Sequence, residues 1–168
     1  MKIRPSGISI SASISFFFAS LISICFLLIN VSPARSEVTV RPIEEADLDE
    51  LINQEQGALI VSFMAAWCAP CIDELPALNN LYRKYRDQGL NVIGISIDLE
   101  GAVAIQPVVS KLKIDFPVYW FGEKAIDRFN LTRIPLLLVV KQGRVVERIP
   151  GRRPEKYLDS KVKSLLGR

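Results

Sequence analysis

The most informative segment of this sequence reads Trp67-Cys68-Ala69-Pro70-Cys71. It follows a continuous apolar run at residues 58–64, which has the length of a strand covered on both faces. After it, apolar residues recur at spacings of three and four until Gly89, which predicts a helix with one apolar face. Two cysteines three residues apart are therefore expected where a buried strand passes into a helix.

The two cysteines are expected to differ because only one of them lies at the tip of the helix. At Cys68, unpaired backbone N–H groups and the helix dipole favour an anion, which lowers the pKa of the thiol. We expect Cys68 to face solvent and to attack a disulfide. Cys71, one turn further along, should be shielded and should displace the product from a mixed disulfide.

Other uses of a cysteine pair compete with redox chemistry. A structural zinc site needs four ligands, whereas the chain has no histidine and no third cysteine after residue 36. A purely structural disulfide stays open as an alternative, although closing so short a loop contributes little entropy. We therefore predict redox chemistry at Cys68 and Cys71, with no metal and no cofactor.

Charge is distributed unevenly along the 168 residues. Lys2, Arg4 and Arg35 account for the whole positive excess, because residues 1–36 contain no acid. Residues 37–168 then hold 18 basic and 18 acidic residues, enough chain for one domain with a substantial core. A domain with zero formal charge has no electrostatic footprint for nucleic acid, so nucleic acid is not an expected partner.

Residues 1–36 have the layout of an export signal. A basic start precedes an apolar stretch, and small residues near the exit suit cleavage after Ala34 or Ser36. The stretch at residues 8–31 is also long enough to remain as a membrane anchor. Both alternatives place residues 37–168 outside the cytoplasm, as a domain that is either soluble in the periplasm or anchored to the inner membrane.

Strand and helix patterns alternate along the rest of the chain. Pro107 is expected to interrupt one of the helices, and Arg152-Arg153 reads as a solvated charge pair. The order of the elements predicts an α/β sheet covered by helices on both faces. The patterns predict helices at 43–53, 101–112, 124–130 and 154–166, strands at 91–98 and 116–121, and an antiparallel hairpin at 136–149.

The cysteine segment resembles the thioredoxin-fold active site, in which a strand leads to Trp-Cys-x-Pro-Cys and then to a helix. Arg133-Ile134-Pro135, ahead of the hairpin, resembles the cis-proline loop of that family. The run from Trp67 to Pro76 is similar to the W-C-x-P-C-x-x-E-x-P signature of exported TlpA/ResA-type reductases. The resemblance covers residues 57–166. It implies a thioredoxin-like fold, with a central mixed β-sheet and a TlpA-type central insertion at residues 98–121.

Glu74 is the acid that the resemblance implies for proton transfer. Cytosolic thioredoxin carries a buried aspartate six residues before its first cysteine, whereas Ser62 stands there in this chain. An uncharged serine cannot accept a proton from Cys71 at neutral pH, which makes Glu74 the substitute. The alternative is an ordinary first-turn glutamate that offsets the helix dipole.

The resemblance also implies a substrate-binding surface made of Trp67, Ile134 and Pro135. A cis Pro135 would present the backbone of Ile134 to an extended substrate next to Cys68, and Trp67 would act as a lid beside the thiols. A strand-edge proline and a half-buried surface aromatic are the alternatives. The family usually has a small residue where Arg133 stands, which leaves the substrate preference open.

The sequence therefore predicts an exported thiol-disulfide oxidoreductase that reduces protein disulfides and receives electrons from a membrane donor. The family resemblance suggests apocytochrome c as a substrate, through cytochrome c maturation. The absence of histidine between the cysteines favours a reductant over a DsbA-like oxidant, which runs the same exchange backward. A redox-silent binding or chaperone module is a further alternative. A thiol peroxidase is another, but such enzymes need a Thr or Ser shortly before the reactive cysteine, and none stands there before Cys68.

Overall fold

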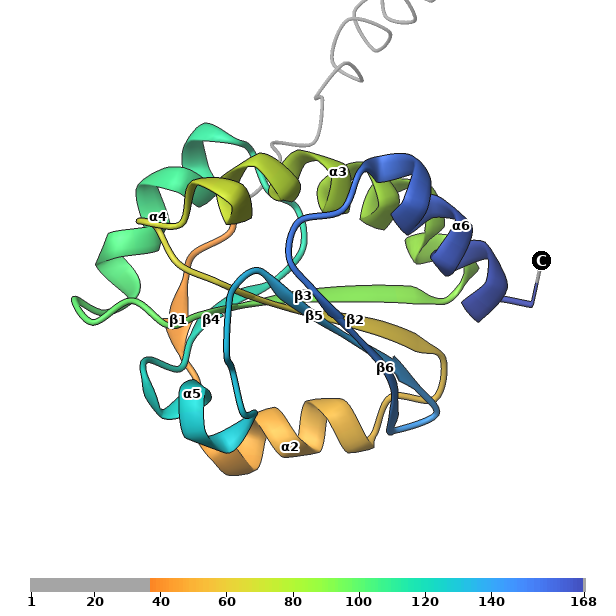
Figure 1. Ribbon diagram of the computed structural model, residues 1–168, viewed down its shortest axis with the longest axis horizontal. Helices are drawn as coiled ribbons and strands as arrows, with labels where there is room; N and C mark the ends of the chain where they lie inside the picture. Colours follow the sequence, from red (N-terminus) through yellow and green to blue (C-terminus); the bar gives the residue numbers. More distant parts are fainter. Residues whose placement is uncertain (1–36, 168) are drawn as a thin grey trace, which may run out of the picture. The chain divides into compact units, whose positions relative to one another are not determined.

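The computed structural model describes residues 37–167, and these residues form one six-stranded sheet between two layers of helices (Figure 1). In spatial order the strands are β1 (Arg41–Pro42), β4 (Val118–Trp120), β3 (Leu90–Ser96), β2 (Ala58–Met64), β5 (Leu136–Lys141) and β6 (Arg144–Pro150). The first four are mutually parallel, and β5 and β6 are antiparallel to their neighbours. The sheet is therefore mixed, as predicted.

The two central strands explain the continuous apolar runs in the sequence. Strand β2 pairs with β3 on one side and with β5 on the other, and all seven of its residues are buried. Such a strand has no solvated face, so it lacks the alternation of apolar and polar residues seen at a sheet surface. Ser62 lies in the middle of β2, buried, opposite Gly94 and Leu137.

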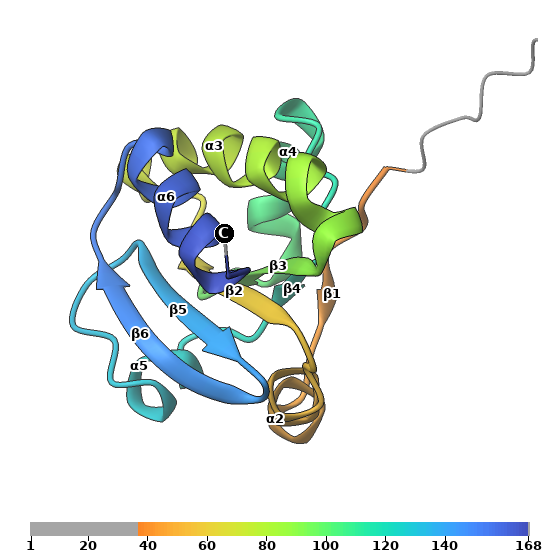
Figure 2. The same cartoon turned by 90° about the vertical axis from the view of Figure 1, so that its right-hand side faces the viewer.

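Helices cover both faces of the sheet, as Figures 1 and 2 show. One face carries α3 (Ala69–Tyr85), α4 (Ala102–Lys111) and α6 (Glu155–Leu165), and the other carries α2 (Glu45–Asn53) and α5 (Lys124–Arg128). A short 3₁₀ turn, η1 (Arg86–Gln88), follows α3. The predicted apolar face of α3 is buried, and within residues 37–167 no helix is long and apolar enough to cross a membrane. The export signal or anchor predicted at residues 1–36 lies outside the described residues.

The predicted insertion widens the sheet. Residues 98–121 form α4 and β4, and β4 lies between β1 and β3. Pro107 lies inside α4 without ending it, which corrects the expected interruption. Its missing N–H leaves the carbonyl of Val103 without a helical donor, and Val103 is 75 % exposed, so water can replace that donor.

Element boundaries differ from the predicted ones where long-range contacts intervene. Helix α2 begins at Glu45 because the N–H of Ile43 still donates to the carbonyl of Trp120 at 3.0 Å and so extends the pairing of β1 with β4. Helix α5 ends at Arg128, and Asn130 just beyond it has a left-handed φ of 48°. The first effect has no local signature in the sequence, whereas an asparagine just past a helix is a local signal for its end.

Candidate functional site

The two cysteines lie at the junction of β2 and α3. Cys68 is the N-cap of α3, and its Sγ accepts a hydrogen bond from the N–H of Cys71 at 3.2 Å. The Cα atoms are 5.2 Å apart, and the two sulfurs form a disulfide. Pro70 is in the first turn of α3, where no helical hydrogen bond needs its N–H. The structure therefore holds the oxidised form of the pair, with Cys68 at the helix tip.

Both cysteines are largely buried, which corrects the expectation that Cys68 faces solvent. Cys68 is 5 % exposed and Cys71 is 2 % exposed, and residues from other segments line the pocket that Cys68 borders. The two residues still differ in what they border. Cys68 lines a pocket of about 580 Å³, and Cys71 is not among its lining residues. Cys68 is therefore the sulfur that a molecule in the pocket would meet.

The pocket beside Cys68 is walled by four separate segments and is mainly apolar. These are the cysteine motif, the end of β3, helix α5 and the loop before β5. Trp67 borders the pocket with a side chain that is 66 % exposed, so it stands at the rim rather than in the core. The lining residues are Trp67, Cys68, Ala69, Pro70, Ile97, Ile126, Leu131, Thr132, Arg133 and Ile134.

The loop before β5 contains a residue of the pocket lining, Ile134, whose backbone has no hydrogen-bond partner within residues 37–167. The peptide bond between Ile134 and Pro135 is cis. Pro135 is buried, and its carbonyl accepts a hydrogen bond from the N–H of Gly151 at 2.7 Å. In contrast, the N–H and C=O groups of Ile134 make no hydrogen bond within residues 37–167. A residue that lines the same pocket as Cys68 thus has a main-chain donor and acceptor without partners in this part of the chain.

Glu74 is a buried carboxyl with one vacant oxygen. It is 1 % exposed and lies one turn beyond Cys71 on α3, a spacing that puts the two side chains on neighbouring positions of one helix face. Its Oε1 accepts the N–H of Arg153 at 2.7 Å, whereas Oε2 has no partner among the described residues. Burial raises the pKa of Glu74, against the lowering effects of that hydrogen bond and of the charges on Arg152 and Arg153.

These contacts revise two of the sequence interpretations. Glu74 lies beyond the first turn of α3 and is shielded from water, so it is not an ordinary first-turn glutamate. Arg152-Arg153 is not simply a solvated charge pair, because its backbone closes over Glu74. The sequence offered no sign of this contact, which joins residues 79 positions apart.

Asp98 is a site residue that sequence reasoning missed. It is fully buried, and its two carboxylate oxygens accept the N–H of Ala66 at 2.9 and 3.1 Å. Oδ2 also accepts the hydroxyl of Ser96 at 2.7 Å. The loop that carries Cys68 is thus tethered to the end of β3. A useful signal existed, since an aspartate that directly follows a buried parallel strand lies at the same sheet edge as the cysteines.

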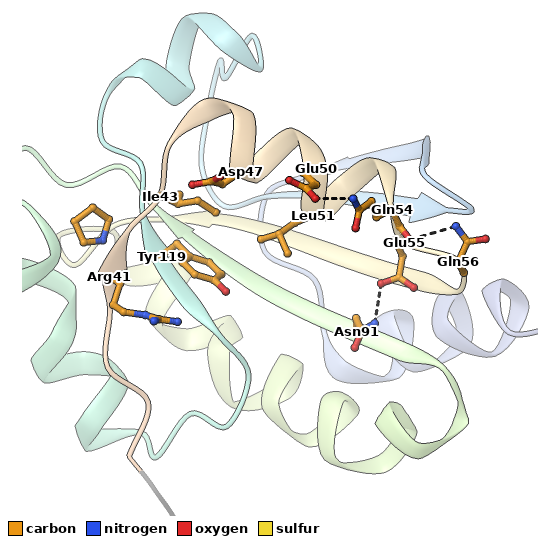
Figure 3. A pocket seen from close by; sticks show the side chains of 11 residues that line it. Arg41, Ile43, Asp47, Glu50, Leu51, Gln54, Glu55, Gln56, Asn91 and Tyr119 are labelled. Carbon is orange, nitrogen blue, oxygen red and sulfur yellow. Dashed lines mark hydrogen bonds between the residues drawn. The ribbon is translucent and has the colours of Figure 1, made fainter.

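A second cavity, of about 700 Å³, lies between α2 and the strands β1, β3 and β4 (Figure 3). Its polar groups bind one another: the amide of Gln54 donates to Glu50 at 2.6 Å, and that of Asn91 donates to Glu55 at 2.7 Å. Neither cysteine of the motif lines it. The cysteine pair is therefore not part of this second cavity.

Comparison with known proteins agrees with this geometry. Residues 36–148 match the family described as the AhpC/TSA family. The thiol-disulfide oxidoreductase ResA of Bacillus thuringiensis (strain Al Hakam) is 31 % identical over 118 residues, which are 69 % of this chain and 68 % of that protein.

Two solved structures share the fold. The thiol:disulfide interchange protein of the thioredoxin family from Chlorobium tepidum TLS is 28 % identical, with a TM-score of 0.62 over 70 % of this chain and 85 % of that one. StoA from Bacillus subtilis is 18 % identical, with a TM-score of 0.57 over 66 % of this chain and 84 % of that one, a likeness that concerns the fold alone. The chain therefore belongs to the AhpC/TSA family, and it is a thioredoxin-fold thiol-disulfide oxidoreductase of the ResA type.

Proposed function

We propose that the protein reduces disulfides of exported proteins, with Cys68 as the attacking thiol and Cys71 as the resolving thiol. In the reduced protein, the Cys68 thiolate attacks one sulfur of a substrate disulfide, and the other substrate sulfur leaves as a thiolate. Cys71, once deprotonated, attacks Cys68 and releases the second substrate thiol. Two electrons pass to the substrate, and the protein is left with the Cys68–Cys71 disulfide that the structure contains.

The observation that carries this proposal is the different placement of the two sulfurs. Cys68 borders the apolar pocket and sits at the helix N-terminus, where its Sγ already accepts a backbone N–H. Such N–H groups and the helix dipole stabilise a thiolate. Cys71 is behind it, away from the pocket lining, and is placed to attack only after Cys68 has reacted.

Glu74 is proposed to take the proton from Cys71 in the second step. A proton acceptor works best when its pKa lies near the working pH, and burial shifts the pKa of Glu74 upward in that direction. The vacant Oε2 gives the proton a place to bind without breaking the hydrogen bond from Arg153. Ser62, buried in β2, has no charge to offer for this purpose.

Ile134, Pro135 and Trp67 are proposed to hold the substrate. An extended substrate segment could pair with the vacant N–H and C=O of Ile134 in the manner of a short added strand. Trp67, at the rim of the pocket, would cover the segment from the other side. This arrangement would bring a substrate sulfur against Cys68.

The site of action is proposed from the first 36 residues. We infer that they export the domain, as a cleaved signal or as an anchor through residues 8–31, and that a membrane dithiol donor restores the reduced pair. Apocytochrome c is the proposed client, because its C-x-x-C-H haem-attachment cysteines must be kept reduced before haem is attached. The absence of histidine between Cys68 and Cys71 favours this reducing direction.

The test compares the wild-type protein with the variants Cys68→Ser and Cys71→Ser. Cys68→Ser should abolish the reduction of a protein disulfide, and Cys71→Ser should stall as a mixed disulfide through Cys68. Client proteins recovered in that trap identify the substrate. Undiminished reduction by Cys68→Ser would contradict the proposal, and rapid peroxide consumption would favour a thiol peroxidase instead.

The direction of the reaction is tested separately by the redox potential of the pair. A reductant should lie nearer to thioredoxin, at about −270 mV, than to DsbA, at about −120 mV. A potential at the DsbA end would make the protein an oxidant.

A further inference from the structure

Arg133 is the charged residue of the pocket beside Cys68. Among the described residues that line this pocket, it alone carries a charge, and the other lining residues are apolar except for Thr132 and the reactive Cys68. It directly precedes Ile134, whose vacant backbone groups are proposed to hold the substrate. A substrate segment that pairs with Ile134 would therefore run past Arg133.

Within residues 37–167, no ion pair compensates the charge on Arg133. Its side chain is exposed, and within residues 37–167 its guanidinium makes no hydrogen bond and no ion pair. The arginine of the neighbouring helix α5 behaves differently: Arg128 binds Glu45 at 2.6 Å and Asp49 at 2.7 Å. An unpartnered guanidinium at the rim of an otherwise apolar pocket is complementary to an anionic group on a bound segment.

We propose that Arg133 makes the enzyme prefer disulfides whose cysteine has a carboxylate side chain beside it and apolar residues around it. This inference rests on the proposed function, because it describes the substrate of the same site. The guanidinium would bind the carboxylate, and the apolar flanking residues would fill the pocket. Because Arg133 is exposed, each change of substrate charge should alter the rate by only about threefold, and salt should weaken the effect.

The experiment uses three peptides that carry a single cysteine as a mixed disulfide with 2-thiopyridine. They differ only in the residue next to that cysteine, which is Glu, Gln or Lys. Release of the thiopyridine is followed at low ionic strength after mixing with the reduced full-length protein. The wild-type protein should react about threefold faster with the Glu peptide than with the Gln peptide, and about threefold faster with Gln than with Lys.

Two variants and a matched control isolate the effect of Arg133. Arg133→Gln should bring the three rates together, and Arg133→Glu should reverse their order. Arg144→Glu changes the net charge by the same amount as Arg133→Glu, on an exposed residue at the other end of the sheet. In the strand register, Arg144 of β6 lies opposite Lys141 of β5, and Lys141 lies opposite Ala58 at the start of β2, whereas the cysteine motif follows the end of β2. The control should keep the wild-type order.

Each remaining outcome overturns a defined claim. If the wild-type protein and Arg133→Glu rank the peptides alike, or if Arg144→Glu changes the ranking as much as Arg133→Glu does, the preference does not come from Arg133. If the Gln peptide reacts through Cys68 but the Glu and Lys peptides react equally fast, the charge preference is wrong and the proposed function still stands. If Cys68→Ser reacts with the Gln peptide as fast as the wild-type protein, the proposed function fails with it.

Discussion

Two buried carboxyls flank the cysteine motif, Asp98 on the side of Ala66 and Glu74 on the side of Cys71. They differ in the number of hydrogen bonds that they accept. Asp98 accepts the N–H of Ala66 and the hydroxyl of Ser96. Glu74 accepts a single N–H, from Arg153, and its second oxygen has no partner among the described residues. Each is at most 1 % exposed, so exposure does not separate them.

The difference lies in hydrogen bonding, and it separates a structural role from a chemical one. A buried carboxyl whose two oxygens both accept hydrogen bonds holds its donors in place. A buried carboxyl with a vacant oxygen gains by binding a proton, and burial correspondingly raises the pKa of Glu74. We therefore expect Asp98 to support stability and Glu74 to support turnover.

The largest expected effect on stability comes from Asp98→Ala. The change leaves the N–H of Ala66 and the hydroxyl of Ser96 without their acceptor, and it should lower the free energy of unfolding by about 3 kcal/mol. Urea denaturation of the oxidised protein measures the loss. Asp98→Asn, which keeps an acceptor for Ala66, should lose less, and a loss of under about 1 kcal/mol for the alanine variant would contradict the tethering role.

Glu74→Gln should leave the first chemical step unchanged and slow the second. Without a proton acceptor, Cys71 should resolve the mixed disulfide about a hundredfold more slowly, the lower end of what general base catalysis provides. Stopped-flow measurement of mixed-disulfide formation and decay separates the two steps. Asp73→Asn is the matched control, because Asp73 is the exposed acid directly before Glu74. Equal slowing of both steps would argue against proton transfer.

The pH dependence of stability should also identify Glu74. Its pKa in the folded protein lies above 4.5, so the folded state binds more protons than the unfolded state as pH rises from that value. The wild-type protein should therefore lose stability relative to Glu74→Gln through this window, by about 1.4 kcal/mol for each unit by which the pKa is raised. Urea denaturation across acid to neutral pH measures the difference. A constant difference, or one of opposite sign, would contradict a raised pKa.

The smallest expected effect comes from Ser96→Ala, which removes one of the donors to Asp98. The loss of this buried hydrogen bond should reduce the free energy of unfolding by about 1 kcal/mol, because the N–H of Ala66 still satisfies the carboxylate. Thermal or urea unfolding detects such a change. A loss as large as that of Asp98→Ala would mean that the hydroxyl, and not the loop tether, carries the stabilisation.

The sequence predicted those parts of the fold and site that depend on neighbours along the chain. The apolar run before Cys68 and the helical spacing after it identified β2, α3 and their junction. Glu74 came instead from the family resemblance, as the replacement for a buried acid at the position of Ser62, and its role in proton transfer stays a prediction.

Contacts between distant segments could not be predicted in the same way. Asp98 binds Ala66 only because β2 and β3 are neighbours in the sheet, and Arg153 closes over Glu74 from the far end of the chain. The burial of Cys68 was missed for the same reason, since part of its pocket comes from the loop before β5. The pattern of apolar and polar residues within one segment carries no information on which distant segments line a pocket beside it.

The proposed roles of the two thiols require Cys68 to be more acidic than Cys71, and alkylation of the reduced protein by iodoacetamide tests this directly. The rate at each cysteine is followed against pH by mass spectrometry. We expect Cys68 to react at least about tenfold faster than Cys71, with a pKa below the free-cysteine value of about 8.5. Equal rates at both cysteines, with a shared pKa at or above that value, would contradict the assignment of their roles.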